Sequence, residues 1–92
     1  MYIIRRTTQF KKDWKRCQKR GLPMEELVTA ITILAEKGCL PPEYKPHRLT
    51  GNRLGEWECH IQPDWLLVWE LDDEYLTLLL LNTGTHADIF KK

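Results

Sequence analysis

Two adjacent apolar segments near the C-terminus constrain the fold of this 92-residue chain more than any other feature. They read "WLLVWEL" and "YLTLLLL", and only the acidic triplet Asp72-Asp73-Glu74 separates them. Short apolar runs bounded by turn residues predict the two strands of a hairpin. The second run is nearly all apolar, which is typical of a central strand that is covered on both faces. The rest of the chain must therefore supply elements that cover a sheet.

A third strand is predicted directly before this hairpin. In "EWECHIQ", apolar residues alternate with Glu56, Glu58 and His60, as in a strand with one exposed face. Residues 62–65, "QPDW", favour a tight turn with proline at its second position. The N-terminal "MYIIRR" is short, apolar and partly β-branched, and it predicts a first strand.

Two helices are predicted between the first strand and the later ones. Phe10, Trp14 and Cys17 recur at helical spacing and indicate a helix over residues 8–20, with Thr7 or Thr8 as N-cap and Gly21 at its end. A second helix begins near Pro23 and ends before Gly38; its apolar stripe contains Met24, Leu27, Ile31 and Leu34. Because about three residues join the helices, we expect an antiparallel helical hairpin.

These elements define the expected architecture. It is an α+β fold in one domain, residues 1–92, of order β-α-α-β-β-β, with the helical hairpin on one face of a small antiparallel sheet. The proline-rich segment 39–55 is expected to be a surface loop, long enough to carry function. We expect "NTGTHADIF" to close the chain as a loop and a short tail.

The charge of the chain is distributed unevenly. Residues 1–20 carry eight basic side chains against one acidic side chain, Asp13, although the net charge of the whole chain is only +1. A basic element of this kind suggests a polyanionic partner, either nucleic acid or an acidic protein. A solvated helix face is an equally good interpretation of the charge alone. The candidate contacts are Lys11, Lys12, Lys15, Arg16, Lys19 and Arg20.

Several classes of protein are disfavoured by the sequence. The longest apolar run, residues 76–81, is far below the roughly 20 residues of a membrane helix, and the N-terminus lacks a signal-peptide pattern, so we expect a cytoplasmic protein without a membrane partner. The three cysteines form no C-x-x-C pair, which favours reduced thiols over a disulfide scaffold or a zinc site. We therefore expect no metal and no cofactor.

The three histidines all lie beside a predicted turn or loop. Histidine exchanges protons near neutral pH, but His47, His60 or His86 taken alone is more often an ordinary surface or core residue. The antiparallel meander can bring them to one cleft, together with Asp64 in the Pro-Asp turn. Such a set suits RNA cleavage without a metal: a base activates the ribose 2′-hydroxyl, an acid protonates the leaving 5′-oxygen, and a cation stabilises the charged phosphorane.

Nearby cations and aromatic residues would complete such a site. Candidates for the cation are Lys45, Arg48 and Arg53. Candidates for stacking on an unpaired base are Trp65 and Phe90. Each aromatic residue also has a structural interpretation: Trp65 can fill the packing face of the sheet, and Phe90 can fix the tail of the chain.

Three ordered motifs carry a resemblance to a known family. The succession "KPHRLTG", "GEWECHIQPDWLLVWEL" and "NTGTHADIF", after a basic β-α-α start, resembles the YafQ-type toxins of the RelE/ParE superfamily over essentially the whole chain. The resemblance implies this α+β fold, ribosome-dependent cleavage of messenger RNA (mRNA), and neutralisation by a cognate antitoxin protein. We expect a toxin that is monomeric when free and part of a hetero-oligomer with its antitoxin.

The resemblance also implies roles for individual residues. His47, His60, Asp64 and His86 would share acid-base and phosphate-orienting work, with His86 as the acid and His60 or His47 as the base; Trp65 and Phe90 would hold the nucleotide. The basic first helix would dock on ribosomal RNA through phosphate contacts.

One position departs from the family pattern. Asn82 stands where many of these toxins have an arginine. As a substrate-binding residue its amide can donate a hydrogen bond to phosphate, but it brings neither a charge nor a bidentate fork. This departure predicts a weakened or context-restricted enzyme unless Arg53 or Lys91 supplies the charge.

Two other functions remain open at this point. One is a non-catalytic inhibitor on the same scaffold that binds a target such as gyrase or the ribosome without cleaving RNA. The other is a plain nucleic-acid-binding module. Neither requires three histidines together, whereas acid-base cleavage does.

Overall fold

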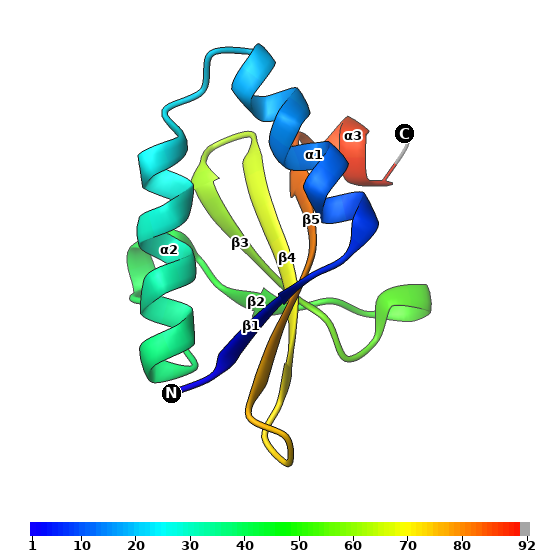
Figure 1. The fold of residues 1–92 in the computed structure, drawn as a ribbon. Helices are drawn as coiled ribbons and strands as arrows, with labels where there is room; N and C mark the ends of the chain where they lie inside the picture. The colour runs from blue at the N-terminus through cyan, green and yellow to red at the C-terminus, as the bar shows by residue number, and fades with distance from the viewer. Residues whose placement is uncertain (91–92) are drawn as a thin grey trace.

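The computed structural model describes residues 1–90, and its elements follow the predicted order closely (Figure 1). The strands are β1 (Ile3–Arg6), β2 (His47–Arg48), β3 (Trp57–Gln62), β4 (Trp65–Asp72) and β5 (Thr77–Gly84). The helices are α1 (Thr8–Lys19), α2 (Met24–Lys37) and α3 (His86–Phe90), and two 3-10 turns, η1 (Pro42–Tyr44) and η2 (Gly51–Arg53), flank β2.

The two long helices begin and end where the sequence predicts. The Thr7 hydroxyl accepts a hydrogen bond from the backbone N–H of Phe10 at 3.0 Å, which caps α1. Gly38 ends α2 in the left-handed conformation, with φ of 75°, and a Cβ there would lie 2.9 Å from the Tyr2 ring. Glycine is therefore required at this position both by the backbone and by the packing of the N-terminus.

The sheet has five strands in the order β1-β5-β4-β3-β2. The meander from β2 to β5 is antiparallel as expected, but β1 pairs with β5 in parallel, from Ile3 opposite Thr77 to Arg6 opposite Leu80. The prediction of a wholly antiparallel sheet was therefore wrong in this one pair. Strands so far apart in the chain share no turn, and only a turn would have revealed their relative direction in the sequence.

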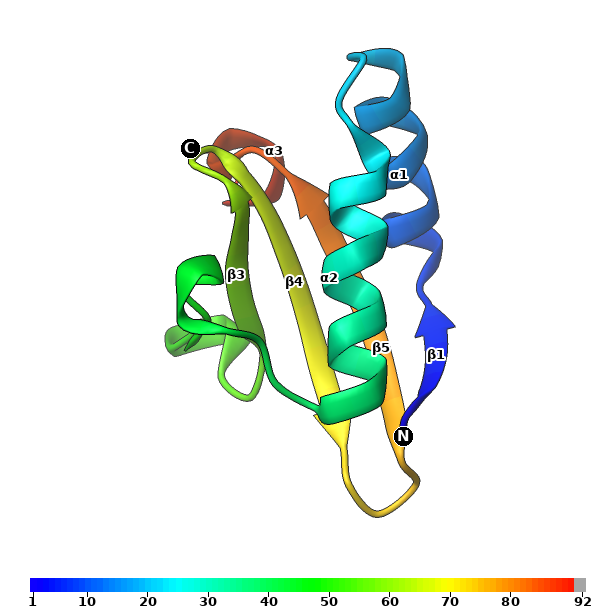
Figure 2. The ribbon, with the colours of Figure 1, turned by 90° about the vertical axis from the view of Figure 1, so that its left-hand side faces the viewer.

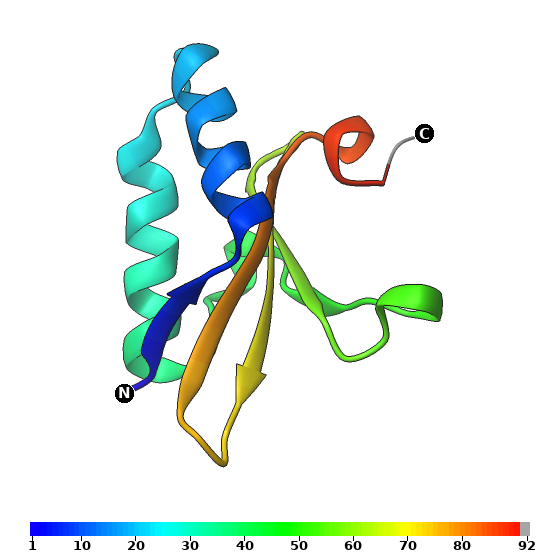
Figure 3. The same ribbon diagram turned by 45° about the vertical axis from the view of Figure 1, so that its right-hand side comes forward.

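Helices α1 and α2 lie on the same face of the sheet, as Figure 2 and Figure 3 show from two sides. The core fills the space between helices and sheet; its largest side chains include Phe10, Trp65, Trp69, Leu27, Leu34, Leu67, Leu78 and Leu80. Strand β4 lies in the middle of the sheet, and five consecutive residues, 65–69, are buried on it. On β5, by contrast, Leu79 and Leu81 are only half-buried on the far face, so β4 rather than β5 is the strand covered on both faces.

A second, smaller cluster covers the far face of the sheet. It consists of Leu66, Val68 and Ile89, with Leu49, Leu81 and Phe90 packed around them. The segments expected to be irregular build this layer: β2 lies within the proline-rich segment, and "NTGTHADIF" forms the end of β5 followed by α3 instead of a loop and tail. The far face is therefore where the motifs of the C-terminal half meet.

Within residues 1–90, no helix is both long and apolar enough to span a membrane. The three thiols are unpaired, and burial raises the pKa of the Cys59 thiol to about 12.

Candidate active site

The sheet register places polar residues of β2, β3 and β5 in one row on the far face, with Val68 of β4 between them. His47 on β2 lies opposite Glu58 on β3, which lies opposite Val68 on β4, which lies opposite Asn82 on β5. His60 lies two residues beyond Glu58 on the same strand, so the pleat directs it to the same face. The alternation of "EWECHIQ" thus brings a carboxylate and a histidine to one surface.

The three histidines lie side by side. The ring centroids of His47 and His60 are 6.5 Å apart, and those of His60 and His86 are 5.9 Å apart. Phe90 follows at 6.3 Å from His86. The structure therefore brings together the histidines that the sequence spread over 40 residues, although their catalytic roles stay predictions.

The Pro-Asp turn orients two of the rings. Nδ1 of His60 lies 3.1 Å from the carbonyl oxygen of Pro63, and Nδ1 of His86 lies 2.8 Å from Oδ1 of Asp64. A carbonyl or a carboxylate only accepts hydrogen bonds, so both Nδ1 atoms carry protons, and each Nε2 is left for other chemistry. Hydrogen bonds from the side chain and the backbone N–H of His86 lower the pKa of Asp64 below its ordinary value.

His47 has a different environment. Its Nδ1 lies 3.2 Å from the carbonyl oxygen of Lys45, and its Nε2 lies 3.1 Å from Oε1 of Glu58, whose side chain is only 5% exposed. Both neighbours are acceptors, so the ring is fully hydrogen-bonded when both nitrogens carry protons. Glu58 had no predicted role, although its alternation with His60 placed it on the right face.

Arg53 reaches the site from η2. Its guanidinium donates to Oε1 of Glu56 at 2.6 Å and to Oδ1 of Asn82, and it lies 5.7 Å from the centre of the Phe90 ring. The positive charge thus lies directly beside the amide of Asn82. Of the two cations considered as substitutes for the family arginine, Arg53 is well placed, whereas Lys91 lies outside the described residues.

Trp65 does not lie at the surface. Its side chain is 2% exposed, and its Nε1–H donates to the Thr83 hydroxyl at 2.9 Å. The prediction that Trp65 stacks on a nucleotide conflicts with this burial, because the tight turn directs the ring into the main core. Phe90 is half-buried and lies beside His86, so it is the aromatic residue available at the site.

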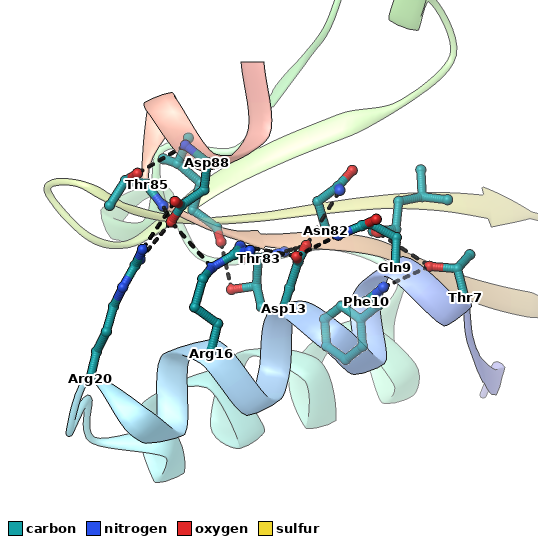
Figure 4. Close-up of polar contacts among 12 residues, drawn as sticks. Thr7, Gln9, Phe10, Asp13, Arg16, Arg20, Asn82, Thr83, Thr85 and Asp88 are labelled. Atoms are coloured by element: carbon teal, nitrogen blue, oxygen red, sulfur yellow. Dashed lines mark hydrogen bonds and ion pairs between the residues drawn. The ribbon is translucent and has the colours of Figure 1, made fainter. Parts of the chain in front are cut away.

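Apart from the face that packs on the core, helix α1 has two polar faces. Gln9, Asp13, Arg16 and Arg20 form a stripe that faces β5 and α3 (Figure 4). Arg20 pairs with Asp88 at 2.5 Å, and Arg16 pairs with Asp13 at 2.9 Å. These two arginines are engaged within the molecule, so the prediction that both serve as RNA contacts does not fit their geometry. Lys11, Lys12, Lys15 and Lys19 are exposed and fall on a separate face of the helix.

Asp13 is the most buried charge of the basic segment, with 2% exposure. Beyond Arg6 strand β1 has ended, so the outer edge of β5 has no strand beside it. There the carboxylate of Asp13 accepts the backbone N–H of Thr83 at 3.1 Å, and Arg16 donates to the carbonyl of Thr83 at 3.3 Å. Two side chains thus replace a neighbouring strand. The sequence carried one indication of this role: Asp13 is the single acidic residue among eight basic ones in residues 1–20.

Among residues 1–90, no group of three histidine, cysteine or carboxylate side chains is arranged to hold a metal ion. The side chains that converge on the far face are proton donors and acceptors, one guanidinium and one aromatic ring. Fold and site together are those of a small α+β domain whose far face carries a cluster of groups that can exchange protons, while a separate face of α1 carries lysines.

The comparisons with known proteins agree with this class. The sequence model of the family described as "Bacterial toxin of type II toxin-antitoxin system, YafQ" matches residues 2–91, and the chain belongs to this family. The mRNA interferase toxin YafQ of Escherichia coli strain K12 is 40% identical over 83 residues, which cover 89% of this chain and 88% of that protein.

Solved structures support the same relationship. A histidine-to-glutamine variant of YafQ from E. coli superposes with a TM-score of 0.90 at 36% identity, covering 98% of this chain and 99% of that one. The crystal structure of the E. coli DinJ-YafQ complex superposes with a TM-score of 0.88 at 37% identity, covering 98% of this chain and 99% of that chain. A metal-bound toxin from Helicobacter pylori superposes with a TM-score of 0.90 at 36% identity, covering 98% of this chain and 100% of that chain.

Proposed function

We propose that this protein is an mRNA interferase, an endoribonuclease that cleaves mRNA on the ribosome and is neutralised by a cognate antitoxin. The observation that carries this proposal is the row of three imidazoles, 6.5 and 5.9 Å apart, with Arg53 and Phe90 at its end. The relative from E. coli is named an mRNA interferase toxin, which agrees with this chemistry. Ribosomes and mRNA place the activity in the cytoplasm.

The hydrogen bonds of His60 and His86 suggest which histidine is the base and which is the acid. His60 is held by Pro63 through Nδ1, and no residue within 1–90 bonds to its Nε2, so His60 takes the proton from the 2′-hydroxyl. Protonated His86, whose positive charge the carboxylate of Asp64 stabilises, gives a proton to the leaving 5′-oxygen. The 2′-oxygen then forms the new bond to phosphorus as the 5′-oxygen leaves, which produces a 2′,3′-cyclic phosphate.

His47 acts on the phosphate rather than as the base. Both ring nitrogens of His47 already face acceptors, the carbonyl of Lys45 and the carboxylate of Glu58, so neither nitrogen is free to take the proton of the 2′-hydroxyl. Glu58→Gln removes the buried negative charge beside His47, and we expect it to lower kcat about tenfold, with a smaller effect on KM, in cleavage assays.

Arg53 supplies the charge that Asn82 lacks. A guanidinium that stabilises a phosphorane contributes about 2 to 4 kcal/mol, or roughly a hundredfold or more in rate. Since Arg53 also bonds to Glu56 and lies over Phe90, part of its charge is already compensated. We infer a competent enzyme that is slower than a relative with an arginine at the position of Asn82.

The face of α1 that carries Lys11, Lys12, Lys15 and Lys19 docks on ribosomal RNA. Four phosphate contacts give a salt dependence with a slope of about −3 to −4 in log K against log salt concentration. Replacing one of these lysines with alanine reduces that slope by about one unit without changing the sequence at which mRNA is cut.

The cognate antitoxin has a suitable docking surface. A groove of about 720 Å³ between β1, α1 and α2 has an apolar floor that includes Ile4, Trp14 and Ile31, and Arg6 and Lys15 lie at its rim. An acidic, amphipathic antitoxin segment that folds on binding fits this combination. The toxin is then a monomer when free and part of a hetero-oligomer with antitoxin.

The decisive experiment is a reconstituted translation system in which mRNA 5′ ends are mapped by primer extension. The wild-type protein is expected to make discrete cuts in translated message, and His86→Ala is expected to make none while its melting temperature stays within a few degrees, since His86 is exposed. Cuts that persist with His86→Ala would contradict the assignment of the acid. Intact message with arrested translation would instead establish a non-catalytic inhibitor.

A further inference from the structure

Arg16 of α1 and Arg20 at its C-cap both contact the helix that carries His86. Arg20 donates two hydrogen bonds to Asp88, Nη1 to Oδ2 at 2.5 Å and Nη2 to Oδ1 at 3.1 Å, and Nε of Arg16 lies 3.6 Å from the same carboxylate. The side chain of Asp88 is only 15% exposed. Figure 4 shows both arginines extending from α1 toward Asp88. We call Arg16, Arg20, Thr85 and Asp88 the α1–α3 clasp.

The same carboxylate also caps α3. The backbone N–H of Thr85 donates to Oδ2 of Asp88 at 2.9 Å, and the backbone N–H of Asp88 donates to the Thr85 hydroxyl at 3.0 Å. This reciprocal pair is a capping box. Because one aspartate serves both contacts, the start of α3 is tied directly to α1.

Gly84 allows the close approach that the clasp needs. Its φ is 147°, and a Cβ on it would lie 2.7 Å from Oδ2 of Asp88 and 3.0 Å from Nη2 of Arg16. Any side chain there would push the carboxylate away from the end of β5. The glycine of the T-G-T-H motif is thus explained by the clasp rather than by contact with RNA.

Helix α3 depends on such contacts. It has five residues, of which only Ile89 is buried, and a helix this short is unstable by itself. His86 is its first residue and Phe90 its last, so the position of α3 sets where both rings lie relative to Asp64 and Arg53.

We propose that Arg20 and Asp88 are positioning residues for cleavage: they hold α3 so that His86 meets Asp64 and Phe90 lies beside Arg53. The kinetic part of this proposal rests on the proposed function, whereas the geometric part does not. A displacement of about 1 Å at a reacting group lowers the rate roughly a hundredfold. Loss of the clasp is therefore expected to lower kcat between tenfold and a hundredfold.

Asp88→Asn separates positioning from RNA docking. Asparagine keeps an acceptor for the N–H of Thr85 but loses the charge that holds Arg20. If Arg20 served mainly as an RNA contact, this substitution would free it and would lower KM with kcat unchanged. Positioning predicts the opposite pattern: kcat falls and KM changes less than twofold. Arg20→Lys, which keeps the charge without the bidentate fork, should regain part of the kcat that Arg20→Ala loses.

The geometric claim is tested without any activity, by carbon NMR titration of the Asp64 carboxyl in the free protein. The pKa of Asp64 lies below its ordinary value chiefly because of its hydrogen bonds with His86, so release of α3 in Arg20→Ala should raise this pKa toward about 3.9. In Asp88→Asn the same rise is expected, reduced by the small lowering that follows from removing the charge of Asp88. Lys37→Ala and Glu36→Gln, which change exposed charges on α2, are the controls and should leave it unchanged. A wild-type pKa retained in both clasp variants would overturn the proposal. If the wild type cleaves no RNA, the proposed function fails, and the titration still decides whether the clasp positions His86.

Discussion

Replacing Asp13 with asparagine is predicted to destabilise the protein more than any other conservative change on α1. The carboxylate accepts four hydrogen bonds: from Gln9 and Arg16 at 2.9 Å, from the backbone of Thr83 at 3.1 Å, and from Asn82 at 3.4 Å. All four partners are donors, so an acceptor-only group satisfies each of them.

The magnitude follows from these contacts. In Asp13→Asn, one oxygen can still accept from Thr83, but the new NH₂ group faces the donors of Gln9 and Arg16. A buried donor without a partner costs about 1 to 3 kcal/mol. Loss of the ion pair to Arg16 adds about 1 kcal/mol, since the arginine is 34% exposed and partly screened. The sum is roughly 3 kcal/mol, or about 12 to 24 °C in melting temperature for a domain of this size.

Urea denaturation followed by tryptophan fluorescence measures this change, with Glu36→Gln as the matched control on α2, because Glu36 is exposed. The expected result is a lower midpoint at an unchanged slope for Asp13→Asn and no shift for the control. A loss of less than about 0.5 kcal/mol would refute the argument that Asp13 replaces a strand at the edge of β5.

Three further predictions concern single side chains. The pKa of Asp88 is lowered chiefly by its hydrogen bond to Arg20, so this pair stabilises the fold above pH 4 and its contribution fades as the pH falls further; unfolding curves of wild type and Asp88→Asn, about 1 kcal/mol apart at pH 7, should converge toward pH 2. Trp65→Phe should lower stability by about 1 to 2 kcal/mol with cleavage nearly unchanged, whereas Phe90→Ala should lower kcat/KM about tenfold with little loss of stability; the reverse pattern would restore Trp65 as the stacking residue. Arg53→Ala should lower the cleavage rate about a hundredfold and Asn82→Arg in that background should restore part of it, whereas an unaffected single variant would exclude Arg53 from the reaction.

The sequence predicts the helices and the meander well because their signals are local. Thr7 and Gly38 mark helix ends through their own backbone contacts, and alternation in "EWECHIQ" assigns the faces of β3. The parallel pairing of β1 with β5 has no local signal. A free N-terminal strand can pair with β5 in either direction until the helical hairpin is packed on the sheet.

The sequence predicts which residues belong to the site better than it predicts their burial and their partners. A histidine beside a turn can be recognised in a sequence. The burial of Trp65, in contrast, depends on the direction in which its side chain points from the turn, which the sequence does not show. Basic residues raise a similar ambiguity: Arg20 and Lys19 are adjacent in sequence, yet only Arg20 finds a carboxylate on α3. Such pairings depend on tertiary packing, and composition does not encode them.

The central claim is that imidazoles cleave RNA through its own 2′-hydroxyl, and a modified message tests this most directly. A single 2′-O-methyl group is placed on the nucleotide that precedes a mapped cut, and the message is translated with the wild-type protein. We predict that this cut disappears while cuts at unmodified sites remain, and that the unmodified 5′ fragment ends in a 2′,3′-cyclic phosphate. Undiminished cleavage at the methylated site, or a fragment that ends in a free 3′-hydroxyl, would contradict the account.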